Sequence, residues 1–233
     1  MDINTAITYV FKDERWIVKT LIGAGLLLIS FLIIPIFFVN GYLLLIVRNV
    51  MDGLEEPLPE WDNWGDMFKD GLNLTIAELV YTLPIWLLMC CASAFFLPAA
   101  FSEGDVAGML AAMGGVSFMI MMCLVLLFVI VYTIISPAIT IQYAREDNLS
   151  ACFQFSEVIG IARDNIGDIL IALLVILGLG LVLGLIGIIP FIGWIISLAG
   201  GIYVTFVSGH LFGQIGQKAG GAPKEKVFDE PAV

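Results

Sequence analysis

Long runs of apolar residues alternate with short polar segments along the whole chain. Most of these runs approach or exceed the length of about 20 residues that a helix needs to cross a membrane. Because a chain in lipid must pair its backbone N–H and C=O groups internally, each run is expected to be a helix. The pattern predicts six membrane spans, at about 17–34, 36–50, 72–97, 113–142, 167–189 and 191–216.

The first two predicted spans come from one apolar stretch that is too long for a single crossing. It runs for 32 residues from Ile17 to Arg48, and a straight helix of that length would extend about 48 Å. The hydrocarbon core of a bilayer is only about 30 Å thick. Pro35 lies near the middle of the stretch, where its ring and its missing N–H interrupt a helix. We therefore expect a hairpin that turns at Pro35.

The placement of Lys and Arg supports six spans rather than five. With six spans every basic residue falls on one side of the membrane, which the positive-inside rule assigns to the cytoplasm. Five spans would instead put the basic N-terminal segment outside. We thus expect a single membrane domain over 1–216, with both termini in the cytoplasm, and a flexible cytoplasmic tail over 217–233.

Three polar segments lead into the predicted hairpins, and each contains a basic residue followed by an aspartate. These entry pairs are Lys12 and Asp13, Lys69 and Asp70, and Arg163 and Asp164. We interpret the chain as an all-α polytopic membrane protein built of three helical hairpins. A short cytoplasmic interfacial helix is expected before each hairpin, at about 4–14, 59–71 and 149–165. The alternative is that membrane entry segments share this pattern without any repeat.

The segment LPEWDNWGDMFKDGL (58–72) combines aromatic and acidic side chains. Trp61, Trp64 and Phe68 are spaced three and four residues apart, which places them on one face of a helix. Tryptophan favours the membrane interface because its ring is apolar and its N–H needs a partner. We expect these three residues and Trp16 to be interfacial anchors. The acidic residues favour docking onto the protein's own helices, and a partner-binding or cation-gathering face is the alternative.

Composition and charge restrict the function classes. Apolar residues make up 60% of the chain and charged residues 13%, whereas a soluble domain has roughly a quarter charged residues. The net charge of −11 disfavours binding to nucleic acid. The four cysteines follow no disulfide or zinc pattern. The sequence also lacks phosphate-binding, dinucleotide-binding and hydrolase motifs, so we expect no cofactor, no metal and no catalytic residue.

Polar residues inside the spans are the default places to look for function, since ionisable groups at membrane depth are costly. Glu78 and His210 are expected at similar depth on the cytoplasmic side, where a Glu–His pair would be able to carry a proton or bind a cation. The polar site would be completed by Asn40, Gln142 and Gln214. The alternative is structural: the glutamate reaches the interface and the histidine bonds a backbone carbonyl.

Several stretches resemble one family. The run GYLLLIVRNVMDGLEEPLPEWDNWGDMFKDGL (41–72), together with FKDERWIVKTLIGAGLLL, PAITIQYAREDNL and SGHLFGQ, resembles the domain-of-unknown-function family 4013 of prokaryotic membrane proteins. The PEWDNW element is the most specific part. The resemblance implies a multi-pass membrane domain without an assigned activity, in the plasma membrane of a prokaryote. It brings no catalytic or binding residues.

The sequence leaves two functions open. The first is a non-enzymatic structural or adaptor-like subunit of a membrane assembly, whose partners are the lipid bilayer and other membrane-protein subunits. The second is a small transporter or permease-like component with a polar cavity on the cytoplasmic side. A membrane enzyme acting on lipid would need chemistry that the motifs do not provide.

Overall fold

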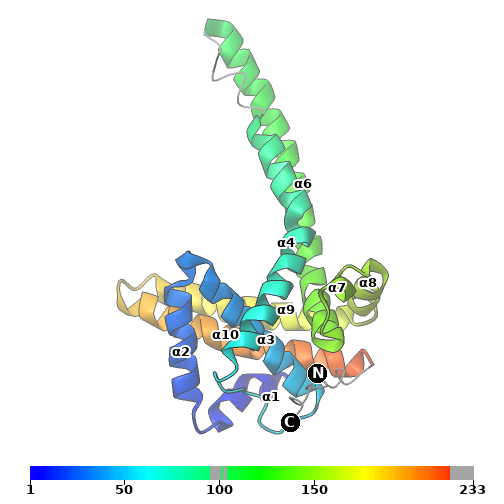
Figure 1. Cartoon of the computed structure of the whole chain (residues 1–233). Coiled ribbons are helices and arrows are strands. Elements are labelled where there is room, and N and C mark those ends of the chain that lie inside the picture. The colour runs from blue at the N-terminus through cyan, green and yellow to red at the C-terminus, as the bar shows by residue number, and fades with distance from the viewer. Residues whose placement is uncertain (95–100, 102–103, 221–233) are drawn as a thin grey trace. The chain divides into compact units, whose positions relative to one another are not determined.

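The computed structural model describes residues 1–94, 101 and 104–220. Their regular secondary structure is helical throughout (Figure 1), which confirms the all-α class. In chain order the elements are α1 (Ile3–Thr8), η1 (Tyr9–Lys12), α2 (Trp16–Leu28), η2 (Ser30–Leu32), α3 (Ile34–Met51), α4 (Trp64–Ala94), α6 (Gly104–Glu146), α7 (Leu149–Cys152), α8 (Phe155–Asp164), α9 (Ile166–Gly187) and α10 (Ile192–Lys218).

The chain forms two compact units where the sequence analysis expects one domain over 1–216. The first unit consists of Met1–Ala77 together with Pro137–Val233, and the second consists of Glu78–Ser136. The long helices α4 and α6 therefore each contribute to both units. The expected tail over 217–233 lies outside the described residues from 221 onward, and α10 continues to Lys218.

Among the described residues, five helices are long and apolar enough to cross a membrane: Ile34–Met51, Trp64–Ala94, Ala111–Glu146, Ile166–Gly187 and Ile192–Lys218. They correspond to the second through sixth predicted spans. The first predicted span, 17–34, contains α2, whose 13 residues extend about 20 Å. This is shorter than the hydrocarbon core. By length and composition the described residues hold five candidate spans, which suggests a multi-pass membrane protein, and the sixth crossing stays a prediction.

The turn between α2 and α3 does not lie at Pro35. The chain reverses over η2, and Ile33 adopts a φ of 68° immediately before α3 begins. Pro35 instead occupies the first turn of α3, where a missing N–H costs nothing because the first amides of a helix have no intrahelical acceptor. The proline therefore starts the second helix, and the turn precedes it.

The three entry segments differ in structure. The expected helix over 4–14 is present as α1 and η1, and the one over 149–165 as α7 and α8. The helix expected over 59–71 is wrong in its first half, because residues 52–63 are not helical and α4 begins at Trp64. From there α4 runs without a break for 31 residues, so this segment is the first part of a long helix.

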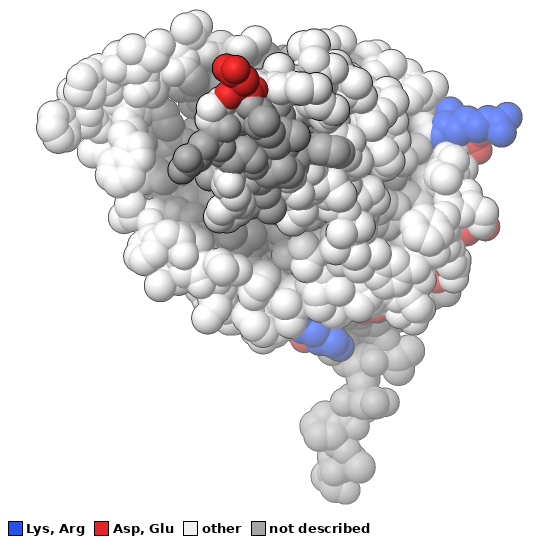
Figure 2. Space-filling view, turned by 90° about the horizontal axis from the view of Figure 1, so that it is seen from above, with Lys and Arg blue, Asp and Glu red and all other residues white. Residues whose placement is uncertain are grey.

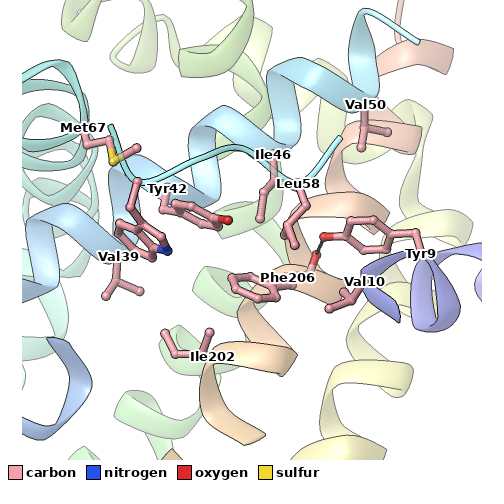
Figure 3. Packing of buried hydrophobic residues seen from close by; sticks show 11 residues of the cluster. Tyr9, Val10, Val39, Tyr42, Ile46, Val50, Leu58, Met67, Ile202 and Phe206 are labelled. Atoms are coloured by element: carbon pink, nitrogen blue, oxygen red, sulfur yellow. Dashed lines mark hydrogen bonds between the residues drawn. The ribbon is translucent and has the colours of Figure 1, made fainter. Parts of the chain in front are cut away.

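Helix α10 is the centre of the first unit and packs against α2, α3 and α9. Its second half is buried nearly all round, and small residues bring it close to α3. A Cβ at Gly209 would overlap Ile46, and one at Gly213 would overlap Val50. Small residues four apart allow such close helix packing in lipid. The core cluster beside this contact includes Tyr42 of α3 and Phe206 of α10 (Figure 3).

Helix α3 and the start of α4 approach each other even more closely, through two glycines. A Cβ at Gly41 would overlap the carbonyl oxygen of Met67, and a Cβ at Gly71 would overlap that of Phe37. Aromatic rings flank this contact, with Phe37 and Phe68 5.6 Å apart between ring centroids. The two glycines thus set the distance at which the polar groups of these helices meet.

Gly71→Ala is expected to destabilise the protein, because the added Cβ has no space beside the Phe37 carbonyl. Overpacking of this kind costs about 1–3 kcal/mol, so the melting temperature in detergent should fall by several degrees. Gly65→Ala in the same helix is the control, since nothing lies within 4 Å of its Cβ position and alanine favours helix. Equal melting temperatures for the two variants would contradict this packing.

Candidate functional site

The non-helical segment 57–61, which we call the strap, is held between α2 and α3. Pro57 and Pro59 have no N–H to donate, and their carbonyl oxygens accept hydrogen bonds from side chains of α3. Asn49 donates to Pro57 at 2.9 Å and Tyr42 donates to Pro59 at 2.7 Å. Irregular backbone is tolerated in membrane proteins where protein surrounds it and satisfies its polar groups. These contacts meet that requirement for the strap.

Trp61 seats the end of the strap in the core. Its ring stacks on Tyr42 with centroids 4.0 Å apart and an interplanar angle of 15°. Its Nε1–H donates to the carbonyl oxygen of Lys19 at 3.1 Å. The exposed fraction of Trp61 is 8%, so little of its ring is left for lipid headgroups. Trp61 is therefore a core residue, and its assignment as an interfacial anchor is corrected.

The other three expected anchors retain some exposed surface. Trp64 is exposed and lies 5.6 Å from Trp61 between ring centroids. Phe68 and Trp16 are half-buried. Trp64 and Phe68 share the aromatic contacts at the α3–α4 crossing, while Trp16 meets Phe11 edge-on at 5.1 Å. An interfacial position for these three residues stays a prediction.

Lys19 is the first of two buried basic side chains around which acidic groups collect. Its side chain is 5% exposed, and its Nζ lies 2.5 Å from an oxygen of Asp13 and 3.1 Å from one of Glu60. The same ammonium donates to the carbonyl oxygen of Leu58 in the strap at 2.9 Å. An unpaired ammonium at this burial would be strongly destabilising. Lys19 therefore ties α2, the entry segment and the strap together.

Arg48 is the second buried basic side chain, and it joins three parts of the first unit. Its guanidinium donates to Asp70 of α4 at 2.5 Å and to Asp147 at 2.6 Å. Its Nε donates to the carbonyl oxygen of Ala144 near the end of α6 at 3.3 Å. A guanidinium offers five N–H donors in a fixed plane, which suits it to several acceptors at once. The side chains of Arg48 and Asp70 are 9% and 5% exposed.

Asp147 reaches Arg48 from an unusual backbone conformation. It follows the end of α6 with a φ of 51°, a region in which aspartate is enriched over most residues. The chain turns sharply there into α7. Tyr143, one turn earlier, accepts a hydrogen bond from Asn73 of α4 at 3.0 Å. The Arg48 cluster thus extends along both α4 and α6.

The entry pairs of the sequence analysis are divided between these clusters and the surface. Asp13 and Asp70 are buried and each binds a basic residue, but the partners are Lys19 and Arg48. The neighbouring basic residues Lys12, Lys69 and Arg163, and also Asp164, are exposed. In the third segment the ion pair is made by Asp168 with Lys218 at 2.7 Å, in an exposed setting. The first and second segments therefore each contain a buried aspartate that pairs with a basic residue, and the third segment does not.

The predicted polar site is brought together only in part. His210 and Gln214 are hydrogen-bonded at 2.9 Å, while Asn40 donates to Thr75 at 3.0 Å. Gln142 is buried on α6, and among the described residues no hydrogen bond joins it or Asn40 to His210. Glu78 belongs to the second compact unit and the other four residues to the first. The pairing of Glu78 with His210 stays a prediction.

An open pocket of about 380 Å³ lies beside His210 and Gln214. Its wall is formed by the N-terminal segment, the residues that precede the strap, and the last turns of α10. The lining residues are Asp2, Thr5, Tyr9, Lys12, Val50, Gly53, Leu54, Glu55, Pro57, His210, Gln214 and Gln217. Within the part of the chain that the structure describes, no group of three His, Cys, Asp or Glu side chains is arranged to hold a metal ion.

The sequence analysis missed Lys19 and Arg48, although a signal for them was present. Both interrupt apolar stretches, in WIVKTL and LLIVRNV, and both were used only to assign the cytoplasmic side. A basic residue inside an apolar helix needs an acidic or carbonyl partner. The positions of Lys19 and Arg48 in apolar stretches therefore predict two buried ion-pair clusters, but they do not predict which residues are the partners.

A family model described as "Protein of unknown function (DUF4013)" matches residues 26–192. The matched range includes Arg48, Asp70, Asp147 and the strap. Comparisons with curated proteins and with solved structures gave no match.

Arg48→Met is expected to cost about 3–5 kcal/mol of unfolding free energy, because it leaves the buried Asp70 carboxylate without its cation. Adding Asp70→Leu should recover part of that loss, since the unpaired charge is then removed. The measurement is denaturant unfolding of the full chain in detergent.

The matched control is Lys218→Met, which breaks the exposed pair with Asp168. Exposed ion pairs contribute less than about 1 kcal/mol, so this variant should unfold close to wild type. A double variant as unstable as the sum of its single changes would show that Arg48 and Asp70 do not stabilise each other.

Proposed function

The chain belongs to the family of proteins of unknown function (DUF4013), and we propose that it is a non-enzymatic, adaptor-like structural subunit of a membrane assembly. The apolar helices make it a membrane protein. In the proposal it lies in the plasma membrane of a prokaryote, crosses six times as three hairpins, and keeps both termini and its entry helices in the cytoplasm. Its partners are the bilayer and other membrane-protein subunits.

The observation that carries this proposal is the exposed, methionine-rich surface of the second compact unit. Met109, Met113, Met119 and Met122 of α6 have exposed fractions of 68%, 58%, 64% and 36%. Methionine is flexible and polarizable, and it is over-used at binding surfaces that adapt to a partner. Lipid contact alone requires only apolar side chains, so this enrichment favours a protein partner.

The two buried basic groups of the first unit's described residues, Lys19 and Arg48, are committed to internal contacts, which also supports a structural role. Lys19 and Arg48 bind acids and backbone carbonyls of the same chain. Among the described residues seen in Figure 2, most of the surface belongs to uncharged residues, as contact with lipid or other apolar helices requires. The chemistry available in the Lys19 and Arg48 clusters is thus used to hold the fold.

The pocket beside His210 favours a second candidate function, a small transporter or permease-like component. Its wall combines basic, acidic and amide side chains with the chain's single histidine. A transport role requires the pocket to open alternately to the two sides of the membrane. The test is uptake of a polar solute into proteoliposomes that contain the protein. Uptake by wild type that is lost when His210 is replaced would favour the transporter over the adaptor.

A photoreactive benzophenone amino acid at Met113 tests the adaptor role. In native membranes, illumination should give a discrete adduct with another membrane protein, identified by mass spectrometry. The same amino acid at Leu185 of α9, which is also exposed and apolar, is the control and should give lipid adducts alone. Lipid adducts at both positions would contradict the proposal, and an adduct with a second copy of the chain would replace it with a homo-oligomer.

Cysteine labelling tests the six crossings. After the native cysteines are replaced by alanine, Phe31→Cys, Asp105→Cys and Ile188→Cys should react with an impermeant maleimide added outside intact cells. Phe31 and Ile188 are exposed, with fractions of 77% and 75%. Glu14→Cys is the cytoplasmic control and should react only after lysis. Reaction of Phe31→Cys only after lysis would show that the first hairpin does not cross the membrane.

A further inference from the structure

Several contacts fasten residues 2–12 to α10, among them the hydrogen bond from the Tyr203 hydroxyl to the Ile7 carbonyl oxygen at 2.8 Å and a short chain of hydrogen bonds that ends on a histidine. The Gln214 side chain bonds the backbone of Asp2 on both sides: its Oε1 accepts from the Asp2 N–H at 2.6 Å, and its Nε2 donates to the Asp2 carbonyl oxygen at 2.9 Å. The same Nε2 lies 2.9 Å from Nδ1 of His210. One amide thus contacts both the segment and the imidazole.

The orientation of the Gln214 amide is fixed by the backbone of Asp2. A peptide N–H can only donate and a peptide C=O can only accept. Turning the amide over would place its NH₂ group against the N–H of Asp2 and its oxygen against the carbonyl oxygen, so both bonds would be lost. With the amide held this way, the group that points at His210 is a donor.

His210 must therefore accept through Nδ1, which requires the neutral imidazole with its proton on Nε2. The side chain is buried, with an exposed fraction of 7%. The ring of Tyr9 lies 4.5 Å away between centroids and covers it from the N-terminal segment. The Tyr9 hydroxyl donates to the carbonyl oxygen of Phe206 at 2.9 Å (Figure 3). The imidazole is thus enclosed between α10 and the segment that it helps to hold.

We propose that His210 and Gln214 form a proton-sensitive clasp that holds residues 2–12 against α10 while the imidazole is neutral and releases them when it is protonated. Protonation puts an N–H on Nδ1, opposite the NH₂ group of Gln214, and two donors then face each other. The amide cannot turn to relieve this without losing both bonds to Asp2. The segment forms one wall of the pocket, so its release widens the entrance.

The other charged groups around His210 are Asp2 on the segment, and Lys12 and Glu55 in the pocket wall. The carboxylate of Asp2 accepts from the N–H and the hydroxyl of Thr5 at 3.0 and 2.6 Å, and these bonds lower the pKa of Asp2 below its usual value. Burial raises the pKa of Tyr9. With the pKa of Asp2 lowered and that of Tyr9 raised, Asp2 is charged and Tyr9 is neutral near neutral pH, so neither group alters the clasp there.

The sign of the effect follows from the bonded form. The hydrogen bond from Gln214 requires the neutral imidazole, so the segment that Gln214 holds is bound at higher pH and released as the pH falls through the titration of His210. Protonation breaks the hydrogen bond between Gln214 and His210 and leaves the imidazolium Nδ1–H without an acceptor. Together these two costs raise the equilibrium constant for opening of the segment about tenfold or more.

Hydrogen exchange of the full chain in lipid nanodiscs tests the clasp. As the pH is lowered from 8 through the imidazole titration of His210, and after correction for intrinsic exchange, amides of residues 3–12 should lose protection about tenfold or more. His210→Asn keeps an acceptor near the position of Nδ1 but does not titrate, so its protection should not depend on pH. Gln214→Ala should lower protection at every pH. Gln217→Ala is the matched control, because Gln217 donates to Val50 of α3, and it should respond as wild type.

A second measurement keeps the test decisive if a variant folds poorly. His210 is the single histidine of the chain, so labelled histidine gives one imidazole signal by NMR when the purification tag contains none. The neutral form should be the Nε2–H tautomer, and its titration midpoint should coincide with that of the exchange. An Nδ1–H tautomer, or protection in wild type that does not change through the imidazole titration, would overturn the proposal.

Discussion

Lys19 and Arg48 must be neutralised inside apolar helices, and the arrangement of the first compact unit follows from this requirement. Each basic group binds one buried acid and one less buried acid, and each also donates to a backbone carbonyl. The carbonyls and acids come from segments distant in sequence. The strap, the start of α4 and the end of α6 are thereby held to α2 and α3.

In the strap, the pairing of the buried Lys19 charge and the hydrogen bonding of the strap's backbone carbonyls depend on the same contacts. Its carbonyl groups accept from Lys19, Asn49 and Tyr42, while its tryptophan donates back to the carbonyl of Lys19. Removal of one member leaves a buried polar group of another without its partner, and such a group costs more than the lost bond is worth. The close approach of α3 and α4 at Gly41 and Gly71 keeps Asp70 within reach of Arg48.

The sequence predicted the helices well, because lipid leaves a long apolar run no other way to pair its backbone. It also placed a break between the spans at 167–189 and 191–216, and α9 indeed ends at Gly187 while α10 begins at Ile192. It failed at the strap, because the spacing of Trp61, Trp64 and Phe68 fits a helix although the first of them precedes α4. Side-chain periodicity does not reveal that carbonyls of this segment are bonded by distant side chains. Leu58 lies 39 residues from Lys19, and Asp70 and Asp147 lie 22 and 99 residues from Arg48; one sequence does not specify such long-range contacts.

The spacing of the charged partners along the chain has a consequence for biosynthesis. Lys19 finds Asp13 only six residues before it, whereas Leu58 of the strap is 39 residues away. Its charge is therefore balanced as soon as α2 leaves the ribosome. Arg48 precedes Asp70 by 22 residues and Asp147 by 99, so it emerges with its charge unbalanced. We expect α3 to remain at the insertion machinery until α4 arrives, and the two helices to enter the bilayer together.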